Sequence, residues 1–332
     1  MDIRKIGIIG CGMVGATVAF ALMESGMFTD MILVDVNRDR AVGEAMDLSH
    51  CQPYIKPVEI RAGEYSDLSD CGIVIITAGV NQKPGETRLD IIKKNVAVFN
   101  SIVPEIVKYN NGAFLLVVSN PVDVLTYVAY KLSGYPSNRV FGSGTVLDTA
   151  RLRYLVGRRL NVDPRSVHAF VVGEHGDSEV AVWSSANVSG IELGDYCTHK
   201  GFTRHEENRK ALADSVKNSA YEIIEKKGAT YYGIAAAVRR ICECIVRDEH
   251  SIMPVSTLVR GHYGLDDVCI SVPSLIGSQG VEDILDIKLD DCEQAALRES
   301  ARTLKDALAE SGFYTDRRCC GKHDGDAPRS SR

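Results

Sequence analysis

The first 142 residues alternate short apolar runs with longer stretches of helical periodicity. The short runs hold Ile, Val and Leu at consecutive positions, which is typical of parallel strands buried on both faces. We expect strands at residues 6–9, 31–35, 58–61, 73–78, 114–119 and 139–141, and helices at 13–25, 39–51, 91–109 and 122–133. This βαβ repetition predicts an α/β fold in which residues 1–142 form a Rossmann domain around a doubly wound parallel sheet.

The pattern changes after Gly142, where long helical stretches are mixed with strands in no regular alternation. We expect helices at 145–160, 203–227, 231–248 and 291–311, and strands at 167–172, 180–186, 253–260 and 268–275. This order predicts a second, α+β domain over residues 143–316. Residues 317–332, which include Cys319 and Cys320, hold almost nothing apolar, so we expect a disordered tail.

Composition narrows the classes of protein that fit. The 332 residues exceed what a single core usually supports, which favours two domains. A net charge of −6 argues against nucleic acid or an anionic membrane as the main partner, because both select basic surfaces. The first apolar run is too short for a signal peptide or a membrane span, so we expect a cytoplasmic protein. The ten cysteines form no Cys-x-x-Cys pair, which indicates reduced thiols and no metal site.

A glycine motif, GCGMVG at residues 10–15, follows the first strand and opens the first helix. Gly10 would permit a tight turn, Gly12 would let the backbone approach a pyrophosphate, and Gly15 would allow close helix–strand packing. Asp35 ends the second strand, where its carboxylate would bind ribose hydroxyls and repel a 2′-phosphate. The combination predicts NAD as the cofactor, although an FAD-binding domain shares the fingerprint and a turn without a ligand is the plain alternative.

A histidine, His175, lies in a turn of small and acidic residues that follows an apolar strand, VVGEHGDSE at residues 171–179. Histidine exchanges protons near neutral pH, and a carboxylate on one ring nitrogen would fix its tautomer. A surface histidine in an acidic turn explains this segment at least as well when it is taken alone.

Three further clusters follow predicted strands, where open α/β sheets bind ligands. Arg88 ends a loop after the fourth strand, Asn120 begins a helix after the fifth, and Asp148 and Arg151 share a helix face. Taken separately, these clusters also fit a solvent-exposed loop, a helix cap and a surface ion pair. A surface ion pair contributes little to stability. Together with a histidine and a nicotinamide-type site, they are what hydride transfer to a carboxylate-bearing carbonyl requires.

Four motifs carry a family resemblance: NQKPGETR at 81–88, SNPVD at 119–123, DTAR at 148–151 and GEHGD at 173–177. The chain resembles the L-lactate dehydrogenase family in its bacterial form, from Lys5 to about Tyr314. The resemblance implies reversible, NADH-dependent reduction of pyruvate to L-lactate. It makes His175 the acid and base, and Asp148 its orienting carboxylate. Arg151 would grip the substrate carboxylate, and Arg88 would polarise the carbonyl.

The resemblance also implies substrate contacts at Asn120 and Thr230 and a specificity role for Gln82. Malate dehydrogenases have an arginine in place of Gln82, so the amide favours pyruvate over oxaloacetate. Malate dehydrogenase or another L-2-hydroxyacid dehydrogenase is the alternative.

Further cofactor contacts, the quaternary structure and an effector are implied in the same way. The implied cofactor contacts are Gly10, Gly12, Met13, Val14, Gly15, Asp35, Arg40, Tyr65, Gly79, Val80, Ser101, Val118, Ser119, Asn120 and Ile234. The resemblance implies a homotetramer in which Arg153 and His168 bind fructose 1,6-bisphosphate at a subunit interface. An arginine on a solvated helix face and a structural histidine are the alternative for these two residues.

Overall fold

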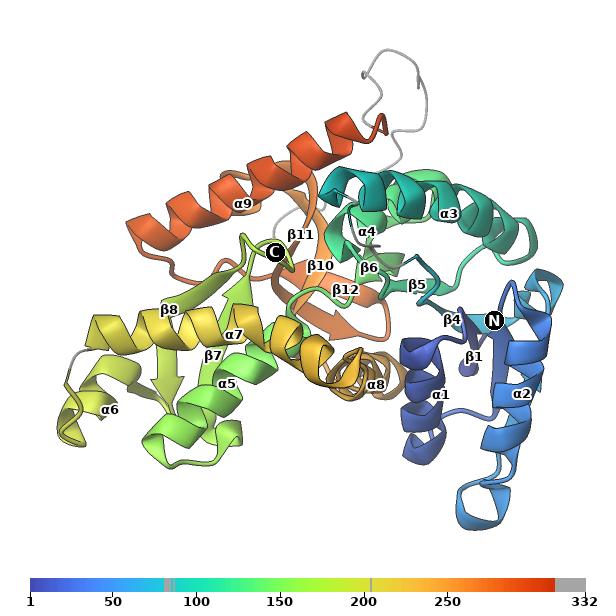
Figure 1. Ribbon diagram of the computed structural model, residues 1–332, viewed down its shortest axis with the longest axis horizontal. Helices are drawn as coiled ribbons and strands as arrows, with labels where there is room; N and C mark the ends of the chain where they lie inside the picture. Colours follow the sequence, from blue (N-terminus) through green and yellow to red (C-terminus); the bar gives the residue numbers. More distant parts are fainter. Residues whose placement is uncertain (81–84, 86, 204, 314–332) are drawn as a thin grey trace, which may run out of the picture.

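The computed structural model describes residues 1–80, 85, 87–203 and 205–313. Six parallel strands form one part of its main sheet, in the order β3-β2-β1-β4-β5-β6 (Figure 1). They are β1 (Asp2–Ile9), β2 (Asp30–Val34), β3 (Glu59–Ala62), β4 (Cys71–Ile76), β5 (Phe114–Val117) and β6 (Val140–Gly142). The helices between them are α1 (Met13–Ser25), α2 (Arg38–Ser49), α3 (Arg88–Tyr109) and α4 (Val122–Ser133). This is the Rossmann strand order, which confirms the predicted α/β class.

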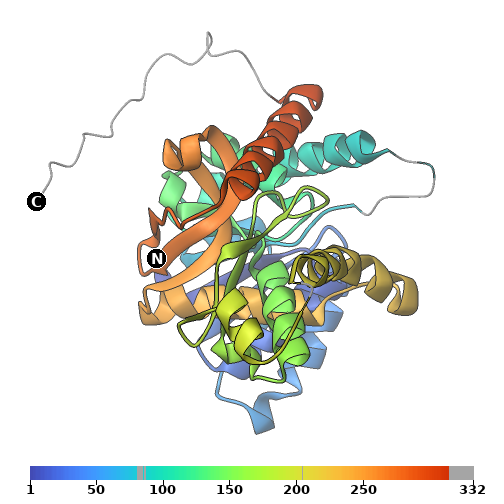
Figure 2. The same cartoon turned by 90° about the vertical axis from the view of Figure 1, so that its left-hand side faces the viewer.

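Helices cover both faces of this sheet (Figures 1 and 2). Val74 and Ile76 of β4 belong to a core shared with α3, α4 and α9 (Asp291–Glu310). Ile73 and Ile75 point the other way, into a core shared with α1, α2 and α8 (Tyr232–Arg247). All four side chains are fully buried, which explains why the strand is a continuous apolar run rather than an alternating one.

Among the described residues the main sheet has nine strands, because three strands from the second half of the chain extend it. These are β10 (Ser251–Arg260), β11 (Asp266–Gly277) and β12 (Gly280–Ile284). Strand β10 pairs antiparallel with β6, with Ser256 opposite Gly142. The runs at 253–260 and 268–275, which were predicted as strands of the second domain, therefore extend the parallel sheet at its β6 edge. An apolar run indicates burial, but it does not specify which edge the strand will join.

The rest of the second half forms a smaller antiparallel sheet with its own helices. Its strands are β7 (Val167–Val172), β8 (Val180–Val188) and β9 (Ile191–Glu192), and the helices are α5 (Val146–Leu160), α6 (Leu193–His199) and α7 (His205–Lys227). Backbone hydrogen bonds between Gly173 and Ser271 fasten the end of β7 to β11 of the main sheet. The segment that follows β7 is thereby fixed beside the carboxyl ends of the parallel strands.

Two sequence predictions cannot be placed in this fold, because Gln82 and the tail at 317–332 lie outside the described residues. Within the described ranges, no helix is both long enough and apolar enough to cross a bilayer.

Candidate active site

The glycine motif adopts the conformation that its sequence predicts. Gly10 has φ of +100°, and a Cβ there would lie 2.6 Å from the Ala78 nitrogen. A Cβ on Gly15 would overlap the carbonyl oxygen of Gly10. Helix α1 starts after Gly12 with no side-chain cap, so its first N–H groups are available to an anion.

The carboxylate of Asp35 accepts hydrogen bonds from the backbone N–H groups of Cys11 (2.6 Å) and Asn37 (2.8 Å). It thus lies beside the glycine loop, at the edge of a cavity of about 510 Å³. Eight of the predicted cofactor residues line this cavity: Gly10, Gly12, Asp35, Arg40, Tyr65, Gly79, Val80 and Ser101. The cavity and the uncapped helix fit a dinucleotide, with Asp35 placed for a ribose.

The other predicted cofactor residues do not line that cavity. Gly15 and Val118 are buried, Met13 is exposed, and Val14 and Ile234 pack against the core beneath β1. The Ser119 hydroxyl donates to the carbonyl oxygens of Ala78 (2.6 Å) and Ile76 (3.2 Å). Asn120 is exposed, and Thr230 is half-buried just before α8.

Asn95 connects the ends of two neighbouring strands, a role that sequence reasoning missed. Its buried side chain accepts a hydrogen bond from the Val80 N–H (2.8 Å) and donates one to the Asn120 carbonyl oxygen (2.8 Å). A polar residue on the apolar face of the predicted helix at 91–109 was the available signal. Asn95 therefore holds the segment after β4 against the segment after β5.

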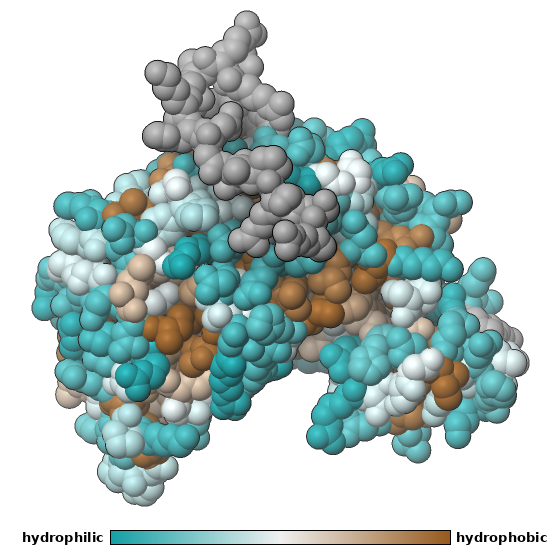
Figure 3. Space-filling model, turned by 180° about the vertical axis from the view of Figure 1, so that it is seen from behind, coloured by the Kyte–Doolittle hydropathy of each residue, from teal (hydrophilic) through white to brown (hydrophobic). Residues whose placement is uncertain are grey.

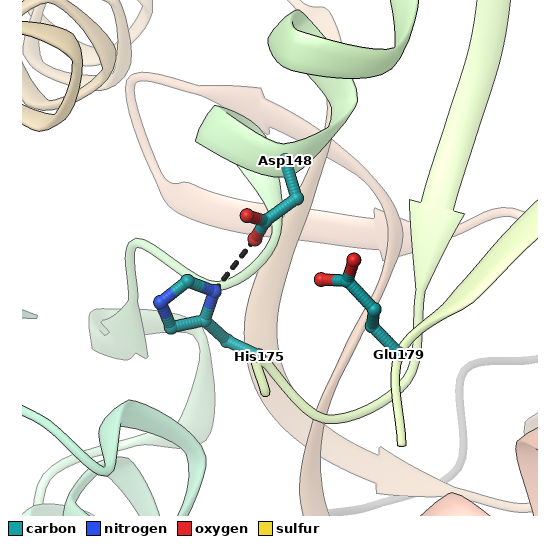
Figure 4. A group of neighbouring side chains, drawn as sticks. All are labelled: Asp148, His175 and Glu179. Atoms are coloured by element: carbon teal, nitrogen blue, oxygen red, sulfur yellow. Dashed lines mark hydrogen bonds and ion pairs between the residues drawn. The ribbon is translucent and has the colours of Figure 1, made fainter. Parts of the chain in front are cut away.

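His175, Asp148 and Arg151 form one hydrogen-bonded group. His175 Nδ1 lies 2.6 Å from Asp148 Oδ2 (Figure 4), and Arg151 Nη1 donates to Asp148 Oδ1 at 2.8 Å. The side chains are 25% exposed for His175, 3% for Asp148 and 13% for Arg151. This burial excludes the surface ion pair that the sequence left open. Because Nδ1 is hydrogen-bonded to Asp148, Nε2 is the ring nitrogen that can contact a ligand.

The backbone of His175 is held by a second carboxylate. Its N–H donates to Asp123 Oδ2 at 2.8 Å, and the Ser271 hydroxyl donates to Asp123 Oδ1 at 3.2 Å. Asp123 is buried in α4, so the Rossmann half of the chain fixes the histidine turn directly. The SNPVD motif contained this residue, but nothing in the sequence indicated that its partner would be a backbone N–H.

Arg88 lies at the start of α3 and forms an ion pair with Glu174, whose side chain is only 1% exposed. The Glu174 carboxylate also accepts a hydrogen bond from the Ser178 hydroxyl, and its backbone N–H donates to Ser300 Oγ (2.7 Å). Arg88 is therefore held next to the histidine turn. Sequence reasoning predicted that Arg88 belongs to this site but assigned no role to Glu174.

The protonation states of His175 and Asp148 depend on the charged groups around them. Burial alone would lower the pKa of His175, but the carboxylates of Asp148, Asp123 and Glu179 together raise it to about 9. Burial alone would raise the pKa of Asp148, yet His175 and Arg151 hold it below its usual value. At neutral pH the ring is therefore a cation beside an ionised carboxylate, ready to donate a proton from Nε2.

Arg153 and His168 line a different cavity, of roughly 670 Å³, together with Arg240 and mainly apolar residues. His168 is exposed on β7, and half-buried Arg153 donates to the Arg165 carbonyl oxygen at 3.4 Å. Seen from behind, the molecule is hollowed between its lower lobes, and apolar side chains gather beside this hollow (Figure 3).

Comparison with known proteins agrees with this geometry. Residues 4–142 match the lactate/malate dehydrogenase NAD binding domain, and residues 145–313 match the α/β C-terminal domain of the same family. The chain belongs to the lactate/malate dehydrogenase family, which confirms the resemblance carried by its motifs.

Individual relatives are closely similar over nearly their whole length. The L-lactate dehydrogenase of Acetivibrio thermocellus is 55% identical over 92% of this chain and 96% of its own. L-lactate dehydrogenase 1 of Clostridium acetobutylicum is 53% identical over 92% of this chain and 97% of its own. The crystal structure of the minor L-lactate dehydrogenase from Enterococcus mundtii, in a ligand-bound form, superposes with a TM-score of 0.90 at 43% identity. The superposition covers 92% of this chain and 98% of the Enterococcus mundtii chain.

Proposed function

We propose that this protein is an NAD-dependent L-lactate dehydrogenase, which reversibly reduces pyruvate to L-lactate. The observation that carries the proposal is the pairing of His175 with buried Asp148, whose other oxygen holds Arg151. A proton donor and a carboxylate-binding arginine thus share one carboxylate at the carboxyl end of a Rossmann sheet. The names of the similar proteins support this activity over others in the family.

The proposed roles of the side chains follow from their chemistry. When bound, NADH supplies the hydride for the carbonyl carbon. His175 donates its proton to the carbonyl oxygen, and Asp148 stabilises the charged ring before transfer. The planar guanidinium of Arg151 grips the substrate carboxylate with two hydrogen bonds. Arg88 polarises the carbonyl and stabilises the developing alkoxide.

The remaining assignments complete the proposed site. Asn120 hydrogen-bonds the reacting oxygen, Thr230 lines the substrate pocket, and Ile234 packs against the nicotinamide. The cofactor contacts are those that the sequence predicts, with Asp35 selecting NAD over NADP. Residues 1–142 serve as the cofactor domain and residues 143–316 as the substrate domain. We place the enzyme in the cytoplasm, because the eight cysteines among the described residues are all free, as in a reducing compartment.

The direct kinetic test is NADH oxidation with pyruvate and with oxaloacetate at saturating NADH. We expect the larger kcat/KM with pyruvate, because oxaloacetate brings a second carboxylate that Gln82 cannot neutralise. A larger kcat/KM with oxaloacetate would instead identify a malate dehydrogenase.

Replacing Gln82 with arginine is expected to move the preference towards oxaloacetate. The new guanidinium pairs the second carboxylate of oxaloacetate, and it faces the methyl group of pyruvate without a partner. The ratio of kcat/KM for the two acids measures the change, with Gln82→Leu as the uncharged control. An unchanged ratio in Gln82→Arg would remove Gln82 from the specificity role.

We further propose a homotetramer that binds fructose 1,6-bisphosphate through Arg153 and His168. Two phosphates would neutralise cationic groups from two subunits, which repel one another without the ligand. The cavity that Arg153 and His168 share supports this proposal, because its lining is mainly apolar and also contains Arg240.

Low millimolar fructose 1,6-bisphosphate is therefore expected to lower the KM for pyruvate by roughly fivefold or more, as allosteric ligands commonly do. The double variant Arg153→Gln, His168→Ala should lose this activation but keep its basal kcat. Equal activation of both proteins, or no activation of the wild type, would refute the effector site.

A further inference from the structure

A third carboxyl group, that of Glu179, lies beside the proton donor and takes no part in substrate binding or proton transfer in the mechanism above. One oxygen of Glu179, one oxygen of Asp148 and one ring nitrogen of His175 all lie within 4.8 Å of one another. Figure 4 shows Glu179 pointing towards the other two from the far side of the histidine turn. Glu179 is only 7% exposed. Three ionisable groups therefore share one largely buried space.

The Glu179 side chain forms no ion pair or hydrogen bond with any residue that the structure describes. The charged and titratable groups that face it come from three elements: Asp148 and Arg151 from α5, His175 from the turn, and Lys217 and Tyr221 from α7. The two nearby cations, Arg151 and Lys217, form their hydrogen bonds with groups other than Glu179. Arg151 donates to Asp148, and Lys217 donates to the Asp177 carbonyl oxygen at 3.1 Å. Tyr221 likewise donates to the Asp177 side chain at 3.2 Å.

An unpaired carboxyl group in this position resists ionisation. Burial, followed by the negative charge of Asp148, raises the pKa of Glu179 to about 8. Glu179 is therefore mainly neutral at pH 7 and gains its charge just below the pH at which His175 loses its proton. Interacting groups of this kind titrate as a pair, so the charge of one changes the proton occupancy of the other.

We propose that Glu179 is a positioning residue that acts through His175 and sets the pH at which His175 releases its proton. The ionised carboxylate stabilises the imidazolium and keeps His175 charged in mildly alkaline solution. Pyruvate reduction, which needs the charged ring, is thereby extended to higher pH, and lactate oxidation, which needs the neutral ring, is held back. The inference rests on the proposed dehydrogenase activity.

The test compares Glu179→Gln with the wild type in pH profiles of kcat/KM for both reaction directions. Glutamine keeps the shape of the side chain but cannot ionise. We expect the alkaline limb for pyruvate to move down by about one pH unit, a typical effect of a neighbouring charge. At pH 7, where Glu179 of the wild type is mainly neutral, we expect kcat/KM for lactate to stay unchanged. Between pH 8 and 9, where Glu179 is ionised, we expect kcat/KM for lactate to rise in the variant, because a lower pKa of the ring increases its neutral fraction. The rate with pyruvate at pH 6 should stay unchanged.

Asp214→Asn is the matched control, because it removes one negative charge from an exposed position on α7. It should leave both profiles in place, and Glu179→Asp should restore the alkaline limb in part. Parallel losses in both directions with unmoved pH midpoints would reduce Glu179 to a structural role and overturn the inference. A wild type that fails to reduce pyruvate would instead overturn the proposed function.

A second measurement does not depend on the folding of the variant. The NMR chemical shift of the His175 ring in the wild type should show two inflections, one near pH 8 from Glu179 and one from the ring itself. A single-step titration would contradict the coupling.

Discussion

Replacing His175 with asparagine is expected to lower kcat for pyruvate reduction by a factor on the order of 10² to 10⁴, the usual contribution of general acid catalysis. The amide fills much of the space of the ring but has no proton to transfer. NADH affinity should be nearly unchanged, because the cavity beside Asp35 lies along other elements. Steady-state kinetics at saturating NADH and fluorescence titration of NADH measure the two effects separately.

The exposed His199 at the end of α6 provides the control, and His199→Asn should behave as the wild type. If His175→Asn bound NADH poorly but turned over at a normal rate when saturated, the acid–base assignment would be wrong.

Replacing Arg151 with lysine is expected to lower kcat/KM for pyruvate by a factor on the order of 10² to 10³, since each lost hydrogen bond to a charged group costs about 1.5–3 kcal/mol. Arg151 already donates one guanidinium nitrogen to Asp148, and its remaining N–H groups are free for a substrate carboxylate. A single ammonium group keeps the charge but cannot span both partners in the same plane.

Arg158→Lys, an exposed change on the same helix, should leave kcat/KM as it is. The measurement is the dependence of initial rate on pyruvate concentration. A normal kcat/KM in Arg151→Lys would show that the substrate carboxylate binds elsewhere.

Periodicity predicted the parallel half of the fold well, because a strand covered by helices on both faces must be apolar throughout. It could not predict that β10 would pair with β6, because only the three-dimensional arrangement brings Ser256 opposite Gly142. The short elements β9, α6 and β12 were also missed. They are only a few residues long and include exposed positions, so they carry little hydrophobic pattern.

Some residues of the site were likewise predictable from the sequence, and others were not. His175, Asp148 and Arg151 were predicted together from motifs, and the structure joins them in one hydrogen-bonded group. Glu174 and Glu179 occur in the same turn, where acidic residues suggest solvent exposure, yet both are buried. Their burial follows from contacts with distant elements, such as the bond from the Glu174 backbone to Ser300 on α9, which local sequence does not reveal.

The most direct test of the proposed activity is the identity and amount of the product. Purified protein should convert pyruvate and NADH into L-lactate, with one L-lactate formed for each NADH consumed, measured by chiral chromatography beside the absorbance of NADH. The account predicts this one-to-one ratio with the L enantiomer alone. D-lactate as the product, or NADH consumption without lactate, would contradict it.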